Sequence, residues 1–168
     1  QTLSAQNMGT VYGGVNIGSG GRMVISEVHS GGRTFENATI VGPGRLDLLQ
    51  TTTFINSSLS NGVLSKTNGT LSVPVGGLTY SGNIGFASNA SVNFVAGTYG
   101  FSTLRVVAGW DGSSALTAPV TPNVGGISVP TAVFISASDI YLNAGTGASG
   151  ITQGSGGTLT ATNLYATS

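Results

Sequence analysis

The sequence predicts an all-β protein, a parallel β-helix (β-solenoid) whose strands stack coil upon coil. The first observation is a recurring phrase: residues 92–98 read Val-Asn-Phe-Val-Ala-Gly-Thr, and residues 140–146, 48 positions later, read Ile-Tyr-Leu-Asn-Ala-Gly-Thr. The second is a shorter echo, in which Ser-Gly-Gly-Arg at 19–22 returns at 30–33. The third is the lack of helical periodicity in a chain with 28 glycines. Self-similarity at a fixed period is typical of stacked repeat proteins.

Short alternating segments supply the strands of this fold. They are rich in β-branched or aromatic side chains and are bounded by Gly, Asn, Ser or Pro, which is the pattern of strands separated by turns. In chain order they are residues 23–28, 45–49, 53–56, 70–73, 91–95, 104–108, 133–137, 139–144 and 158–161. The alternative fold, a β-sandwich or jelly roll, has short strands and turns of the same kind.

The recurring phrase also predicts part of the core. Alternate residues of a strand point to the same face, so matched positions of the two phrases are expected on one inner wall. These core residues are Val92, Phe94, Ala96, Ile140, Leu142 and Ala144. With about 24 residues in each coil, the two phrases stack two coils apart and the chain forms about seven coils.

The length of 168 residues predicts a single solenoid domain over residues 1–168. One stretch departs from the strand pattern, because Pro119, Pro122 and Pro130 cannot donate to a strand ladder and Gly125-Gly126 accompanies them. We expect a Pro/Gly-rich loop excursion near residues 113–130, between two stretches of coils.

The composition excludes several classes of function. Charged residues make up 6% of the chain, and five basic residues balance five acidic ones. There is no basic stripe, so we expect no nucleic-acid partner. No run of 18 apolar residues is present, so we expect no membrane span. The chain starts at Gln1, which indicates either a processed secreted protein or a segment of a longer one.

Candidate chemical groups are few. Residues 145–150 match GxGxxG, but the glycine-rich residues that follow do not form the helix that a dinucleotide site needs. His29 is the single histidine and precedes a turn, with no nucleophile motif to serve. The aspartates Asp47, Asp111 and Asp139 stand apart, and cysteine is absent. We therefore predict no enzyme activity, no cofactor and no metal site. A polysaccharide-active β-helix enzyme is kept as an alternative.

The glycine-rich coils resemble a known family. Residues 139–146, followed by 150–153 and 156–161, resemble coils of filamentous-haemagglutinin-type exoproteins of bacteria, and residues 106–112 are similar to a phrase in those proteins. The repeated Ser-Gly-Gly-Arg resembles repeats of self-associating autotransporter passengers. The resemblance implies a right-handed β-helix, secretion to the bacterial cell surface, and an adhesive or fibre-forming role.

The two ends of the chain carry the functional hypothesis. A solenoid leaves unpaired N–H and C=O groups at its ends unless a cap covers them, and neither Gln1–Ala5 nor Thr158–Tyr165 resembles a cap. Two uncapped ends predict head-to-tail stacking into an extracellular fibre, a homopolymer. We expect Thr160→Pro to block the C-terminal end. The candidate assembly residues are Gln1, Leu3, Leu159, Thr160, Leu164 and Tyr165.

A second function class stays open. The chain would instead be the β-helix segment of a large secreted adhesin that binds a surface glycan or a host receptor. Aromatic faces stack well on sugars, and the candidate stacking residues are Trp110 and the tyrosines Tyr12, Tyr80, Tyr99, Tyr141 and Tyr165.

Overall fold

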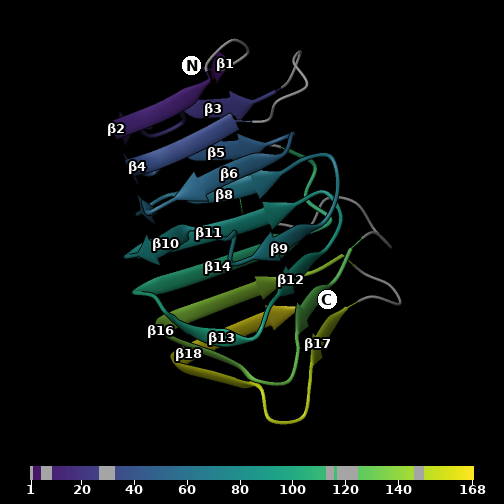
Figure 1. Cartoon of the computed structure of the whole chain (residues 1–168). Helices are drawn as coiled ribbons and strands as arrows, with labels where there is room; N and C mark the ends of the chain where they lie inside the picture. Colours follow the sequence, from purple (N-terminus) through teal and green to yellow (C-terminus); the bar gives the residue numbers. More distant parts are fainter. Residues whose placement is uncertain (1, 5–8, 27–32, 113–115, 117–124, 146–149) are drawn as a thin grey trace.

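The computed structural model describes residues 2–4, 9–26, 33–112, 116, 125–145 and 150–168. These residues form strands and no helix, and the strands stack as a β-solenoid of about six turns (Figure 1). Every strand pair within them is parallel. The predicted all-β solenoid is confirmed. The alternative sandwich, which needs antiparallel pairs, is wrong, and the expected seven coils are about six.

Three parallel sheets form the walls of the solenoid. Sheet A has nine strands: β1 (Thr2–Ser4), β3 (Arg22–Ile25), β5 (Arg45–Leu48), β8 (Val63–Lys66), β11 (Asn83–Ser88), β14 (Thr103–Ala108), β16 (Val133–Asn143), β13 (Gly97–Gly100) and β18 (Thr158–Thr167). Sheet B has five: β2 (Thr10–Asn16), β4 (Arg33–Val41), β6 (Thr52–Ile55), β7 (Ser57–Ser60) and β10 (Leu78–Ser81). Sheet C has four: β9 (Leu71–Val73), β12 (Val92–Phe94), β15 (Ile127–Val129) and β17 (Ile151–Gln153).

The length of a coil varies along the solenoid. Arg45 pairs with Val63 in a short coil, whereas Asp139 pairs with Asn163 in a longer one. The step between β14 and β16 is longer still, because Thr103 pairs with Asp139 and the chain leaves the coil in between. The spacing of the recurring phrase therefore does not correspond to two coils.

The two recurring phrases lie on different walls. Val92 pairs with Leu71 and Ile127 in sheet C. Ile140 pairs with Leu104 and Leu164 in sheet A. The predicted stacking of the phrases is wrong.

Five of the six residues predicted for the core are buried nonetheless. Val92, Phe94, Ile140, Leu142 and Ala144 all belong to the main hydrophobic cluster. Ala96 is exposed, and its prediction is wrong, because the chain turns after Phe94 from sheet C toward β13. Alternation thus identifies the inward side chains within a strand, but it does not extend past the corner where the strand ends.

Asparagines in the left-handed region form bends in the coils. Asn37, Asn56 and Asn61 have φ angles of 51°, 48° and 52°. Asn37 lies within β4 and Asn56 between β6 and β7, all in sheet B, whereas Asn61 forms the corner between sheets B and A. Asparagine tolerates this region better than other residues with a Cβ atom, because its short amide bonds to nearby backbone. Asn61 also accepts a hydrogen bond from the Asn83 N–H through its side-chain oxygen at 3.0 Å, which fixes the corner of one coil against the next.

The interior is one continuous apolar cluster that includes stacked aromatic rings. Phe35 and Phe54 from adjacent coils stack with centroids 5.1 Å apart. Phe86 lies edge-on to Tyr80, Phe94 and Phe101. Because inward residues of successive coils touch, the described coils share a single core, as expected for one solenoid domain.

A second buried cluster lies on the outer face of sheet A. Trp110 packs there with Ala87 and Val107, and Leu116 contacts the same cluster. Of these residues only Leu116 falls in the predicted excursion, of which residues 113–115 and 117–124 lie outside the described residues. The excursion is shorter than predicted at its C-terminal side, since Ile127–Val129 forms strand β15.

Candidate assembly ends of the solenoid

Both edges of sheet A lie at the ends of the stack. β1 pairs with β3 on one side, and β18 pairs with β16 on one side. No described strand pairs with the other edge of either strand. β2 is likewise the edge of sheet B at the N-terminal end, and β17 is the edge of sheet C at the C-terminal end. Open strand edges present rows of N–H and C=O groups that pair readily with another chain.

The C-terminal end is a long strand with an apolar tip. β18 runs beside β16 for most of its length, from the corner of sheet B into sheet A. Leu164 and Tyr165 are 52% and 51% exposed, whereas Leu159 is partly buried against the core. The sequence prediction of a repeat-like strand at Thr158–Tyr165 is confirmed. The strand extends further, to Thr167.

The direction of each backbone group follows from the ladder. In a parallel strand the N–H and C=O of one residue point to one neighbour, and those of the next residue point to the other. The Ala144 N–H donates to the Thr167 C=O at 2.9 Å, so Thr167 and Tyr165 face β16. Leu164 and Ala166 therefore direct their N–H and C=O groups away from the solenoid.

The same reasoning changes the role expected of Thr160. The Phe101 N–H donates to the Ser136 C=O at 2.9 Å, so Ser136 faces β13 and its neighbour Ile135 faces β18. Ile135 pairs with Leu159, which places the N–H of Thr160 in the ladder with β16. Thr160→Pro would therefore break β18 away from β16 rather than cap the outer edge. The outward donors of this half of β18 belong to Leu159 and Ala161.

At the N-terminal end, the ladder likewise shows which backbone N–H and C=O groups of β1 point away from the solenoid. The Arg45 N–H donates to the Gly21 C=O at 3.0 Å, so Arg45 faces the N-terminal end of the stack. Thr2 and Arg22 occupy the same column of sheet A as Arg45. Thr2 and Ser4 thus direct their backbone groups outward, and Leu3 directs its own toward β3. Gln1 lies outside the described residues.

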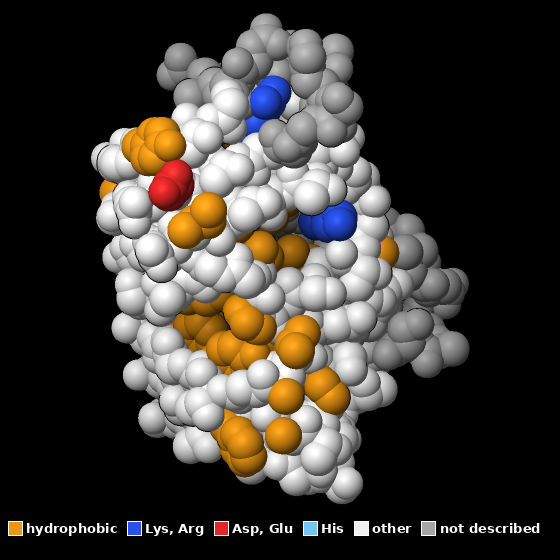
Figure 2. Space-filling model, in the orientation of Figure 1, with side chains coloured by type: hydrophobic (Ala, Val, Ile, Leu, Met, Phe, Trp, Pro, Cys, Tyr) orange, Lys and Arg blue, Asp and Glu red, His pale blue; other side chains and the backbone are white. Residues whose placement is uncertain are grey.

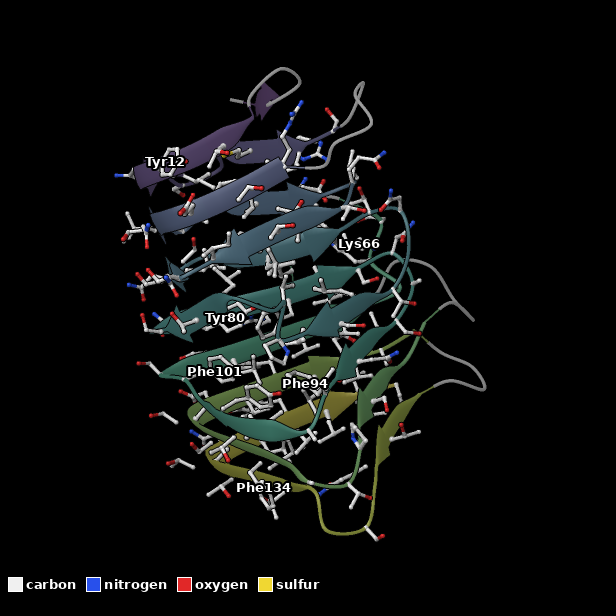
Figure 3. All side chains as sticks on the ribbon, in the orientation of Figure 1. Tyr12, Lys66, Tyr80, Phe94, Phe101 and Phe134 are labelled. Carbon is white, nitrogen blue, oxygen red and sulfur yellow. The ribbon has the colours of Figure 1, made fainter. Side chains whose placement is uncertain are left out.

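Sequence reasoning missed Tyr12 as a residue of this end. Tyr12 is 63% exposed on β2, at the edge of sheet B (Figure 3). The sequence does contain a signal, because Tyr12 is a large aromatic residue in a glycine-rich segment near one end. The direction of the Tyr12 side chain could not be predicted, because β2 changes register at Tyr12 and Gly13.

Neither end carries a charged side chain. The first charged residue of the chain is Arg22, and the last is Asp139. Approach of one end to another therefore meets no repulsion between like-charged side chains, and salt has little to screen.

A ladder of side chains leads to the C-terminal end on sheet A. Arg105, Tyr141 and Tyr165 occupy one column of the sheet. The Arg105 guanidinium lies 4.2 Å from the centroid of the Tyr141 ring, and the Tyr141 and Tyr165 rings stack at 4.7 Å. The ladder holds Tyr165 in a fixed position at the edge of the stack.

Among the described residues, no three His, Cys, Asp or Glu side chains form a group that could hold a metal ion. Asp47 is buried and accepts a hydrogen bond from the Arg22 guanidinium, and the Thr67 hydroxyl donates to the same oxygen at 3.4 Å. Desolvation by burial lowers the pKa of nearby Arg45, and the charge of Arg22 adds to this effect. His29 lies outside the described residues.

The aromatic residues weighed as sugar platforms have different surroundings. Trp110 is buried beneath the Arg45 guanidinium, 4.5 Å from its ring centroid, so its face is not accessible for stacking. Tyr99 is buried as well. Tyr141 and Tyr165 stack on each other, and Tyr80 lines a cavity on sheet B.

Comparison with known proteins adds no relative. No family model, curated protein or solved structure matches this chain. No described segment forms a helix that is long and apolar enough to cross a membrane.

Proposed function

We propose that this chain is a structural subunit that stacks head to tail into an extracellular fibre. The observation that carries the proposal is that sheet A ends in an unpaired parallel edge at both ends of the described solenoid, at β1 and at β18. Two different surfaces that complement each other make a heterologous contact. A heterologous contact that does not close into a ring continues as a filament.

The backbone directions of the two ends are complementary. Continuing the column of Tyr165 places Thr2 of the next copy beside Tyr165 and Leu3 beside Ala166. The Ala166 N–H would then donate to the Thr2 C=O of the next copy, and the Ser4 N–H would donate to the Ala166 C=O. The first half of β18 would meet β2, the edge strand of sheet B, in the same way.

Hydrogen bonds and the burial of apolar surface would both stabilise the contact between copies. Each backbone bond contributes about 0.5–1.5 kcal/mol net. The outward N–H donors on β18 belong to Leu159, Ala161, Leu164 and Ala166. Leu164 and Tyr165, each about half exposed, add apolar area that the next copy would cover.

Electron microscopy of two variants tests the proposal. Ala166→Pro removes the outward N–H that would donate to the Thr2 C=O of the next copy and places a ring at the edge, while the ladder between β18 and β16 keeps its donors. Ala166→Ser is the matched control, because it changes the side chain and keeps the N–H. We expect long fibres of solenoid width for the native chain and for Ala166→Ser, and short particles for Ala166→Pro. Fibres of equal length from all three would contradict the proposed contact.

The extracellular location is a separate part of the proposal. It is supported by the resemblance of residues 139–161 to secreted bacterial exoproteins, and by a surface that relies on uncharged polar residues. Antibody labelling of intact producing cells, compared with lysed cells, tests it. Labelling that requires lysis would contradict this location and leave the stacking untouched.

A further inference from the structure

One wall of the solenoid is interrupted between two neighbouring coils. Sheet B ends at β10, and β13 of the next coil pairs with β16 instead. The coils rejoin on both sides of this point, where the Val95 N–H donates to the Val73 C=O at 2.7 Å and the Ser102 N–H donates to the Gly82 C=O at 2.9 Å. β10 and β13 therefore border a slit in which no described residue joins them by a backbone hydrogen bond.

Both borders of the slit direct backbone groups into it. The Asn61 N–H donates to the Ser81 C=O at 3.2 Å, so Ser81 faces β7 and Tyr80 faces the slit. On the other border, Gly97 and Phe101 donate their N–H groups to Ala132 and Ser136 and so face β16.

Thr98 and Gly100 alternate with those residues and face the slit. The two edges run parallel, and both have the direction of the solenoid strands on either side. The slit thus has N–H and C=O groups on two sides, from alternate residues of each border strand.

The floor of the slit is aromatic and uncharged. A cavity of about 270 Å³ lies between β10 and β13, lined by Pro74, Leu78, Thr79, Tyr80, Thr98, Tyr99, Gly100 and Phe101. Tyr80 and Phe101 pack on the buried Phe86 ring with centroids 5.2 and 6.1 Å away. Figure 2 shows apolar side chains gathered in a hollow on this face, and Figure 3 places Tyr80 and Phe101 together there.

The oxygens of the two tyrosines already have partners within the protein. The Val75 N–H donates to the Tyr80 oxygen at 3.1 Å, and the Tyr99 hydroxyl donates to the Val95 C=O at 2.5 Å. What the slit offers to a partner is therefore backbone groups and ring surface, together with the hydroxyl group of Thr98.

A second hollow provides room for a chain to enter and leave. It has a volume of about 650 Å³ and shares Tyr80, Gly100 and Phe101 with the slit. Its remaining lining is small and polar, from Ser102, Ser136, Ser138, Thr160 and Thr162 among others.

We propose that the slit binds an extended, uncharged peptide segment of a partner protein as an added parallel strand. A strand is the ligand whose regular N–H and C=O groups satisfy both borders at once. Because β10 and β13 each have four residues, the bound part is a strand of about that length. The lining holds no charged side chain, so a charged segment would lose its hydration without gaining a partner. Inward side chains of the segment would rest on Tyr80 and Phe101.

Amide hydrogen exchange by NMR tests the premise residue by residue. The chain carries Ala166→Pro to exclude end-to-end pairing. In the free chain, the amides of Tyr80, Thr98 and Gly100 are expected to exchange fast. Thr79, Ser81 and Tyr99, which alternate with them and face β7 or β16, are expected to exchange slowly. Equal protection of both sets would overturn the proposal, because the slit would then be closed.

A defined peptide tests the binding itself. The probe is an acetylated and amidated Thr-Val-Thr-Val-Thr-Val peptide, and its control carries N-methyl groups at alternate residues. Binding of the probe should slow exchange at Tyr80, Thr98 and Gly100, and the control should leave them unchanged. Thr98→Pro, which removes one slit-facing donor, should weaken the probe about fivefold, the effect of one hydrogen bond. Thr98→Val, which keeps the donor, should not.

Three results would overturn the proposal. The first is that the probe leaves the three amides unprotected. The second is that the N-methylated control binds as well as the probe, since backbone pairing would then not be the contact. The third is that a neutral oligosaccharide such as cellohexaose protects these amides and the probe does not, since the slit would then be a glycan site.

Discussion

Truncation of Phe94 tests the packing of the solenoid core. Phe94 is 2% exposed, and its ring lies 6.0 Å from that of Phe86 and 6.1 Å from that of Tyr99. Replacing a fully buried Phe by Ala costs about 3–5 kcal/mol, because transfer free energy is lost and a cavity remains. The two ring contacts place Phe94→Ala in the middle of that range, at about 4 kcal/mol. The matched control is the next residue, Val95, whose side chain is 50% exposed. Val95→Ala should change stability by no more than about 0.5 kcal/mol.

The assay is urea unfolding followed by the fluorescence of the buried Trp110. Both substitutions are made in the Ala166→Pro chain, so that stacking between copies does not add to the measured stability. The reasoning predicts a lower midpoint for Phe94→Ala with an unchanged denaturant slope. A loss below about 1 kcal/mol would refute the packing described for β12, because no buried aromatic truncation is that mild.

Two further predictions concern polar groups. Asp47→Ala removes the buried carboxylate that pairs with Arg22 and should cost about 3 kcal/mol, the low end for a buried pair since Arg22 is partly exposed. An unchanged urea midpoint would contradict it. Burial raises the pKa of Tyr80 from 10.0 to about 12. Between pH 10 and 12 the Tyr80 hydroxyl therefore loses its proton in the unfolded chain and keeps it in the folded chain. The free energy of unfolding should fall by about 1.4 kcal/mol per pH unit across that window. Tyr80→Phe should remove most of this fall, and an equal alkaline loss in Tyr80→Phe would assign it to other groups.

The predicted segments correspond to eight of the eighteen described strands, and the pairing of the strands was not predictable. Strands rich in glycine or serine, such as β7 and β13, were missed because few of their residues are apolar or β-branched. Alternation in segments such as 91–95 and 104–108 identifies the inward residues, because strand geometry repeats every two residues. Pairing depends on the length of each coil, and that length is set by corners and loops with no periodic signal. The excursion after Trp110 lengthens one coil, so that Thr103 pairs with Asp139. This is why Val92 and Ile140, which open the two recurring phrases, lie in different sheets.

The sequence located the candidate ends, but it did not show which residues there direct their N–H groups outward. Repeat-like residues at Thr158–Tyr165 predicted an edge strand, and β18 is one. Which residues direct their N–H groups outward depends on a single step of register. The sequence therefore suggested Thr160, whereas the ladder assigns this role to Leu164 and Ala166. The slit beside β10 was not predicted, since Leu78–Ser81 was not among the predicted strands and the sequence does not show which strands lack a neighbour.

Sedimentation velocity of the purified native chain tests the central claim most directly. If the ends pair as proposed, the native chain sediments as polymers that grow with concentration. Their size should be nearly constant from about 50 mM to about 1 M salt, because neither end carries a charged side chain to screen. The Ala166→Pro chain should sediment as a monomer under the same conditions. A native chain that stays monomeric at high concentration across this salt range would contradict the account.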